Sequence, residues 1–363
     1  MDETVPQQVE EDTIETVEPT HAVGRDQVEG VHEYANLLMK EVEKLPDGDL
    51  INEMLATTLK LLRDQNNRAD LKLINTSLKE LRYALKVFTP YKEVRKISIF
   101  GSARTATDHR DYLAAVEYGR RIAELGWMVI TGAGGGIMAA GHGGAGAKPS
   151  FGLAIRLPFE QRTNEFIEGD PKLIQFKYFF TRKLMFVRSS HAIAVFPGGF
   201  GTMDEGFEVL TLVQTGKAPP MPIVYIDHEG SNFWAGWQAY VKDHLLASRL
   251  ISEDDLHLYK VTQSIDEGLR EVTHFYSNYH SIRYVRDQLV MRIARKPSER
   301  QMDEIRRKFG HMAVKGSMEL REALPQEKDE PSLAHMPRLT FAFNKRDQGG
   351  LRTLINYLND EVG

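Results

Sequence analysis

Apolar residues recur at two different spacings along the chain. Between residues 28 and 89 they return every three or four positions, which predicts one helix before Pro46 and two more over residues 50–66 and 69–87. From Val94 onward, short apolar runs alternate with amphipathic segments. The runs that predict strands are residues 96–100, 127–131, 151–157, 191–196 and 221–226. The main helices predicted among them cover residues 111–125, 202–216 and 234–246.

Strands that alternate with helices indicate βαβ units. We therefore expect an α/β fold: a Rossmann-like parallel sheet with helices on both faces, preceded by a helical region and followed by a small α/β extension. In the extension, an apolar stripe in the basic segment 282–307 predicts a helix, and residues 313–337 resemble a connector. Residues 339–343 and 350–359 predict one strand and one helix. The expected divisions are an acidic tail (1–27), a helical region (28–92), a Rossmann-like domain (93–275) and an extension (276–363).

Composition narrows the class of protein. A chain of 363 residues with 42% hydrophobic residues can bury a full core, and its net charge of −5 argues against a surface coated with nucleic acid. The absence of cysteine excludes disulfides and thiolate metal sites. No run reaches the roughly 18 apolar residues of a membrane span, and the N-terminus lacks the pattern of a secretion signal, so we expect a cytoplasmic protein without membrane contact. Residues 1–24 carry seven acidic side chains and no Lys or Arg, which predicts a mobile tail.

Three glycine-containing turns follow predicted strands, at residues 101–102, 132–136 and 197–202. The carboxyl ends of parallel strands share one edge of a sheet, where ligands bind, so the turns should converge. Glycine lets the backbone approach a ligand, and the free N–H groups of a helix start favour an anion such as phosphate. The candidate binding residues are Gly101, Ser102, Gly132, Gly134, Gly135, Gly136, Gly198, Gly199, Gly201 and Thr202, with Lys183 from the segment before the last turn.

Neither common nucleotide fingerprint is present in these turns. Ile137 occupies the position of the third glycine of G-x-G-x-x-G, and residues 156–158 lack the acidic residue that would hold a ribose hydroxyl. Residues 216–218 do not form a Walker A loop. The turns therefore point to a mononucleotide, and we expect no cofactor.

Glu205 has two interpretations. It lies at the start of the helix predicted after the last turn, where a carboxylate would stand beside an anion pocket. However, Thr202-Met203-Asp204-Glu205 also fits the capping box S/T-x-x-E, in which the glutamate only accepts a hydrogen bond from a backbone N–H. Spacing alone leaves both open.

Three features together resemble the Lonely Guy (LOG) family. They are R-K-x-M-x-x-R at residues 182–188, the apolar strand that follows, and P-G-G-x-G-T-x-x-E at residues 197–205. Members of the family are nucleoside 5′-monophosphate phosphoribohydrolases, often labelled lysine decarboxylases. The resemblance runs from about residue 94 to residue 225. Phe180, Phe200 and Asp204 depart from the residues usual in cytokinin-releasing members, and residues 145–178 resemble a broader bacterial branch.

The resemblance implies that Arg182 and Glu205 are catalytic and that the glycine turn at 198–201 binds phosphate. Breaking an N-glycosidic bond builds positive charge on the ribose, which a nearby carboxylate stabilises. Arg182 does not lose its proton, so it would orient Glu205 or hold the base or phosphate; the alternative is a surface ion pair. For Arg188, a role in the site and a structural ion pair both remain open. Asp204 is a candidate acid for protonating the leaving base.

Two functions follow as hypotheses. The first is hydrolysis, without a metal, of AMP or an N6-modified AMP to the free base and ribose 5-phosphate. The alternative is a carrier or sensor that binds a nucleotide or cofactor on the same fold without hydrolysis. We expect a nucleoside monophosphate as partner and a homo-oligomer, in which the helices of residues 28–89 cover the main domain or form the contact. The basic stretch 283–308 has acidic neighbours, which favours a solvated helix face over a nucleic-acid contact.

Overall fold

The computed structural model describes residues 25–64, 66–156 and 163–362, and the chain divides between Ile74 and Asn75 into two compact units. The described part of the chain begins with three helices, as predicted: α1 (Arg25–Val42), α2 (Gly48–Lys60) and α3 (Arg68–Phe88). The predicted tail lies outside the described residues over 1–24. Among the described residues, no helix is long and apolar enough to cross a membrane.

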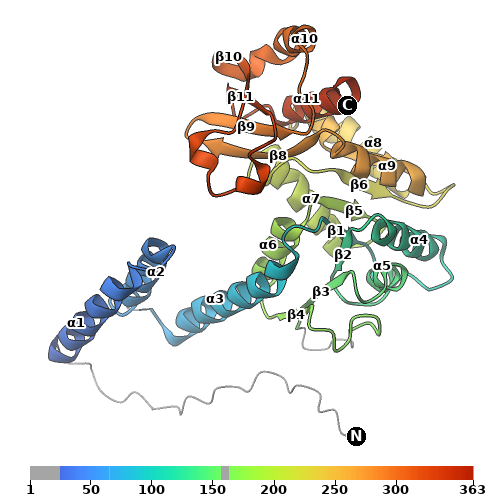
Figure 1. The fold of residues 1–363 in the computed structure, drawn as a ribbon. Coiled ribbons are helices and arrows are strands. Elements are labelled where there is room, and N and C mark those ends of the chain that lie inside the picture. The colour runs from blue at the N-terminus through green and yellow to red at the C-terminus, as the bar shows by residue number, and fades with distance from the viewer. Residues whose placement is uncertain (1–24, 65, 157–162, 363) are drawn as a thin grey trace, which may run out of the picture. The chain divides into compact units, whose positions relative to one another are not determined.

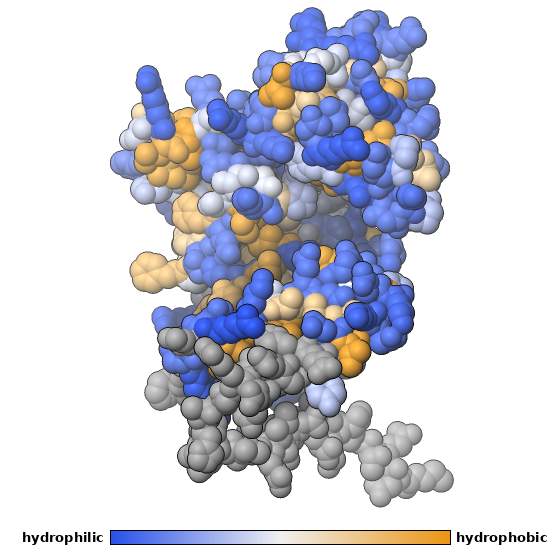
Figure 2. All heavy atoms as spheres, turned by 90° about the vertical axis from the view of Figure 1, so that its left-hand side faces the viewer, coloured by the Kyte–Doolittle hydropathy of each residue, from blue (hydrophilic) through white to orange (hydrophobic). Residues whose placement is uncertain are grey.

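Large apolar side chains remain open to solvent on the first two helices. About half or more of the surface of Leu37, Leu38, Leu50 and Met54 is exposed. Figure 2 shows hydrophobic (orange) side chains open among hydrophilic ones on the face that it displays. Helices with this pattern bury their apolar stripe against another element in a stable protein.

The second unit is built on a parallel sheet of seven strands, which confirms the expected Rossmann-like α/β class. Its order is β4-β3-β2-β1-β5-β6-β7, with β1 paired to β2 and β5. The strands are β1 (Lys96–Phe100), β2 (Met128–Thr131), β3 (Ser150–Ile155), β4 (Leu173–Phe176), β5 (Ala192–Val195), β6 (Ile223–Ile226) and β7 (Lys260–Thr262). The sequence patterns did not reveal β4 and β7, which are short edge strands.

Helices cover both faces of this sheet because alternate strand residues are apolar on both sides. Ala192 and Ala194 face one core and Ile193 and Val195 the other. Helices α4 and α5 lie on one side of the strands and α6 on the other (Figure 1). The helices of this unit's sheet are α4 (Arg110–Glu124), α5 (Ile137–Ala145), α6 (Phe179–Ser189), α7 (Phe200–Gln214), α8 (Phe233–Tyr240) and α9 (Ile265–Phe275).

A second, antiparallel sheet forms the extension, in the order β10-β11-β9-β8. Helices α10 and α11 contribute to its hydrophobic core, with Ile305, Leu354 and Leu358 fully buried. Its elements are β8 (Tyr279–Val285), β9 (Gln288–Ile293), α10 (Glu299–Phe309), β10 (Ala313–Arg321), β11 (Arg338–Phe343) and α11 (Gln348–Glu361). The predicted final strand and helix are confirmed as β11 and α11.

Two predictions for the extension are wrong. Residues 282–307 are not one helix but the hairpin β8–β9 followed by α10. Val285 pairs with Gln288, so Arg286 and Asp287 form a two-residue turn, and Arg286 has a φ of 57°. Residues 313–337 are not only a connector, because they contain β10. This strand is largely exposed and its register against β11 shifts twice, so its sequence lacks a regular alternation.

Candidate functional site

The three glycine turns converge beside the central strand of the parallel sheet. Because β1 pairs with both β2 and β5, the turns after these strands are neighbours at the carboxyl edge. The chain order reverses between β1 and β5, and such a switch point is where ligands bind in open α/β sheets. The expected convergence is therefore confirmed.

Ser102 joins the turns through its backbone. Its N–H donates to the carbonyl of Pro197 at 3.1 Å, and its carbonyl accepts from the N–H of Ile137 at 3.0 Å. Its hydroxyl accepts from the N–H of Arg104 at 3.1 Å, which shapes the loop after β1. Ser102 thus links the loop after β1, the start of α5 and the turn before α7.

A cavity of about 790 Å³ opens at this junction. Many of the candidate residues line it, namely Gly101, Ser102, Gly132, Arg182, Gly198, Gly199, Gly201, Thr202 and Glu205. Gly134, Gly135, Gly136 and Lys183 are not among its lining residues. Arg104, Phe179 and Phe186 also line the cavity and give it a cation and apolar walls, although no sequence motif pointed to them.

The candidate glycines fall into two groups, according to whether an added Cβ atom would clash with other atoms of the protein. At Gly136, with a φ of 57°, a Cβ would lie 2.2 Å from the carbonyl oxygen of Ser102. At Gly198 it would lie 2.1 Å from Oγ1 of Thr202. Both glycines therefore permit close packing within the protein. At Gly199 and Gly201, a Cβ would meet no described atom within 4 Å, so the protein itself leaves this space open.

The capping interpretation of Glu205 is wrong. Helix α7 begins at Phe200 with Gly199 as its N-cap, and the N–H groups of Thr202 and Met203 donate to the carbonyl of Gly199. Thr202 is therefore already inside the helix, and Glu205 lies in its second turn. A capping glutamate occupies the third helical position after a Ser or Thr N-cap, which is not where Glu205 stands.

Glu205 and Arg182 meet in the wall of the cavity. The side chain of Glu205 is 9% exposed and that of Arg182 is 13% exposed, with Oε1 and Nη2 3.7 Å apart. The Arg182 guanidinium lies 5.0 Å from the ring centre of Phe179 and 5.7 Å from that of Phe186. The pair is thus largely removed from water, unlike the surface ion pair considered as an alternative.

Burial raises the pKa of Glu205 to about 7. Lys183 and Arg182 act in the opposite direction, and the carboxylates of Glu208 and Asp204 add to the rise. Desolvation of the charged form is thus the larger effect. A carboxyl group with this pKa can gain or lose a proton at neutral pH, which is the property required of a general base or acid.

Lys183 contacts two carboxylates and does not itself line the cavity. Its Nζ lies 2.7 Å from Oδ2 of Asp204 and 2.7 Å from Oε2 of Glu208. It lines a separate hollow of about 770 Å³ together with Arg188. The structure does not bring Lys183 and Arg188 together with Glu205 in the cavity. Asp204 lines both spaces, and its side chain is 62% exposed.

Part of the chain matches a known protein family. Residues 134–272 match the family model described as possible lysine decarboxylase. No curated protein sequence matches the chain.

Several solved structures share a part of the fold. They include a molybdenum cofactor binding protein from Rippkaea orientalis (16% identity, TM-score 0.37, covering 50% of this chain and 96% of that one). A molybdenum cofactor carrier protein from Chlamydomonas reinhardtii gives 18% identity, a TM-score of 0.36 and the same coverage. DNA processing protein A from Helicobacter pylori gives 12% identity, a TM-score of 0.35, and coverage of 49% and 80%. Similarities of this extent carry no argument about function, and the fold assignment rests on the sheet topology.

The matched region contains Arg182, Glu205 and the turn at 198–201, the features on which the resemblance rests. Over residues 134–272, this chain is similar to the family whose model is described as possible lysine decarboxylase.

Proposed function

We propose that the protein hydrolyses the N-glycosidic bond of a nucleoside 5′-monophosphate, AMP in the first place, to the free base and ribose 5-phosphate. The observation that carries the proposal is the buried carboxyl group of Glu205, paired with Arg182 in the wall of a cavity that the glycine-rich start of α7 also lines. The similarity of residues 134–272 to the family model agrees with this activity, but family and fold do not by themselves specify a reaction.

The start of α7 supports a phosphate subsite. The first N–H groups of a helix have no partner within the helix and carry partial positive charge. The open space at Gly199 and Gly201 would let a phosphate approach them closely. Arg104, which also lines the cavity, adds a positive charge. A monophosphate fits these features better than a neutral nucleoside.

The chemistry assigned to Glu205 follows from its charge and pKa. In the proposed reaction, water forms a bond to C1′ of the ribose while the C1′–N bond breaks. Ionised Glu205 would stabilise the positive charge on the ribose and accept the proton of the attacking water. Arg182 would hold the carboxylate in place. The departing base would take a proton from solvent, and Glu205 would return to solvent the proton that it accepted from the attacking water. Phe179 and Phe186 supply apolar surface against which a base can lie.

We also propose a homo-oligomer and the domain division given above. The exposed leucines of α1 and α2 and the exposed Phe180, Leu184 and Phe207 of α6 and α7 are apolar surfaces that a second copy would cover. Sedimentation analysis of the purified chain tests the assembly, and a monomer at micromolar concentration would contradict it.

The test of the activity is a panel of nucleoside monophosphates and their nucleosides, with ribose 5-phosphate or ribose measured as product. We expect release from at least one monophosphate and poor turnover of the matching nucleoside. Equal turnover of AMP and adenosine would contradict the phosphate subsite. Tight binding of AMP without product from any monophosphate would instead indicate the carrier function.

A further inference from the structure

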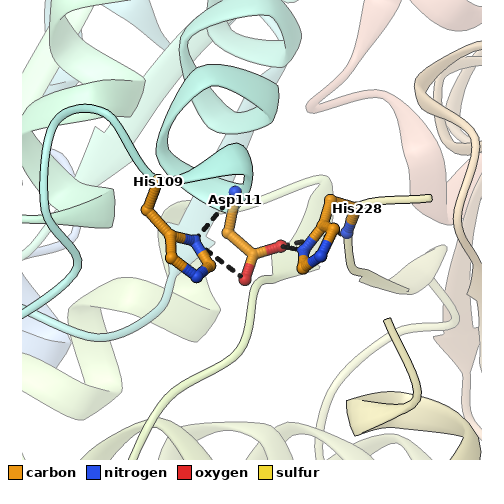
Figure 3. Close-up of side chains that lie close together, drawn as sticks. All are labelled: His109, Asp111 and His228. Carbon is orange, nitrogen blue, oxygen red and sulfur yellow. Dashed lines mark hydrogen bonds and ion pairs between the residues drawn. The ribbon is translucent and has the colours of Figure 1, made fainter. Parts of the chain in front are cut away.

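Two histidines and an aspartate meet at the start of α4, outside the cavity. His109 precedes the helix, Asp111 lies in its first turn, and His228 follows β6. In Figure 3 the carboxylate of Asp111 lies between the two imidazole rings. One candidate ligand atom from each residue lies within 4.8 Å of the other two. None of the three is among the described residues that line the Glu205 cavity.

We propose that these side chains form a binding site for a transition-metal dication, with Zn²⁺ as the best fit. Two imidazoles and one carboxylate are ligands that Zn²⁺ accepts, and a three-ligand site leaves a position for water. Mg²⁺ and Ca²⁺ prefer oxygen ligands throughout, so the donor set disfavours them.

The distances suit a small cation. Nδ1 of His228 lies 3.0 Å from Oδ1 of Asp111, a hydrogen bond that a bound metal would replace, and Nδ1 of His109 lies 3.5 Å from Oδ2. Two ligands of a tetrahedral Zn²⁺ with bonds of 2.0–2.1 Å are about 3.3 Å apart. The His109 side chain is half exposed, so it can adjust its ring and admit the ion from solvent, while Asp111 is buried.

The hydrogen bonds around His109 give an independent argument. Its Nδ1 accepts from the N–H of Asp111 at 3.1 Å, so in this arrangement it carries a lone pair rather than a proton. That nitrogen also faces the carboxylate oxygen Oδ2, which places two electron-rich atoms opposite each other. A cation beside both relieves the repulsion.

The site would connect two loops at the carboxyl edge of the parallel sheet. The backbone N–H of His228 already donates to Oδ1 of Asp111 at 2.9 Å, which holds the loop after β6 against α4. The loop before His109 begins at Gly101–Arg104 in the cavity wall. Metal binding at His109 would hold the other end of this loop in place. We therefore expect the bound metal to raise the melting temperature of the protein.

The test is calorimetric titration of tag-free, chelator-treated protein with Zn²⁺, and separately with Mg²⁺. We expect one Zn²⁺ per chain and no comparable binding of Mg²⁺. His109→Asn is the informative variant, because asparagine is a good N-cap and should keep the metal-free melting temperature while removing the ligand. His228→Gln is the second, since the backbone bond to Asp111 stays. Each should weaken Zn²⁺ binding about tenfold or more.

His274→Asn serves as the matched control. His274 lies 2.7 Å from Asp360 but is exposed and belongs to no described three-ligand cluster, so its replacement should leave the affinity unchanged. Wild-type affinity in both the His109 and the His228 variant would overturn the proposal. So would an equal loss in the His274 control, failure of the wild-type protein to bind Zn²⁺, or equal binding of Mg²⁺.

Discussion

At the scale of single residues, Glu205 is the position where burial and charge act against each other. Desolvation raises its pKa from 4.5 to about 7, although two cations lie nearby. Keeping this carboxylate ionised above pH 7 therefore costs about 3 kcal/mol relative to the unfolded chain. A protein gains nothing in stability from such a group, whereas a site that transfers protons at neutral pH requires one.

The first prediction concerns the pH dependence of turnover. Because the ionised form of Glu205 is the active one, kcat/KM for AMP should rise between pH 5.5 and 8.5 with a midpoint near pH 7. Initial rates of ribose 5-phosphate release across this range provide the measurement. A midpoint near pH 4.5, or a flat profile, would show that Glu205 does not carry the reaction.

The second prediction concerns stability. The folded-state pKa of Glu205 is raised, so the stabilising contribution of its protonated form is complete below about pH 4.5 and is lost as pH rises through about 7. Glu205→Gln removes this loss. The free energy of unfolding of the variant, relative to that of wild type, should therefore be higher at pH 8 than at pH 5, by up to about 3 kcal/mol. Urea denaturation at both pH values measures it, and an identical difference at both would count against the raised pKa.

At the scale of elements, the turn into α7 combines glycines of two kinds. Gly198 packs against Thr202, whereas Gly199 and Gly201 border open space. We predict that Gly198→Ala lowers the melting temperature because its Cβ meets Oγ1 of Thr202. Gly199→Ala and Gly201→Ala should leave folding intact and weaken AMP binding, because the added methyl groups enter the phosphate space.

Thermal melts and AMP titrations of the three variants separate these roles. Gly201→Ala is the sharpest case, since alanine inside a helix is favoured over glycine by up to about 1 kcal/mol. Unchanged AMP affinity in both Gly199→Ala and Gly201→Ala would contradict a phosphate subsite at this turn.

The sequence predicted the parallel sheet and the cavity better than the extension, for physical reasons. Strands such as β5 are buried on both faces, so they appear as continuous apolar runs between glycine turns. The β8–β9 hairpin turns at Arg286-Asp287, which lacks the usual glycine signal, and its apolar residues happen to match a helical period. Whether Glu205 caps or reacts depended on where α7 begins, and spacing could not decide it. The His109–Asp111–His228 cluster joins residues 117 positions apart and left no signature in the local patterns.

At the scale of the whole second unit, the extension is joined to the Rossmann-like part by buried polar contacts. Asn359 of α11 donates from Nδ2 to the carbonyl of Phe275, the last residue of α9, at 2.8 Å. Its Oδ1 accepts the N–H groups of Asn278 and Tyr279, at 3.1 and 2.9 Å, and so holds the start of β8, where the extension begins. The hydroxyl of Tyr276 donates to the carbonyl of His191, next to β5. These contacts favour one cooperative unfolding transition for residues 75–362.

Replacing Asn359 tests this coupling. Asn359→Ala leaves three buried backbone groups without their partner, so it should lower the free energy of unfolding by about 3 kcal/mol or more. Asn356→Ala on the same helix is the control, because Asn356 is half-buried and accepts only a bond from Nε of Arg352 among the described contacts. A loss in Asn359→Ala no greater than in the control, or two separate transitions in wild type, would contradict the coupling.

Release of ribose 5-phosphate from AMP shows whether the Glu205 carboxylate drives hydrolysis of a nucleoside monophosphate. Wild type is compared with Glu205→Gln and with Glu208→Gln, a glutamate one turn later that pairs with Lys183 outside the cavity. We expect turnover in wild type and the Glu208 variant, a loss of about a hundredfold or more in the Glu205 variant, and AMP affinity retained in all three. Near-normal turnover in Glu205→Gln would contradict this role of the carboxylate.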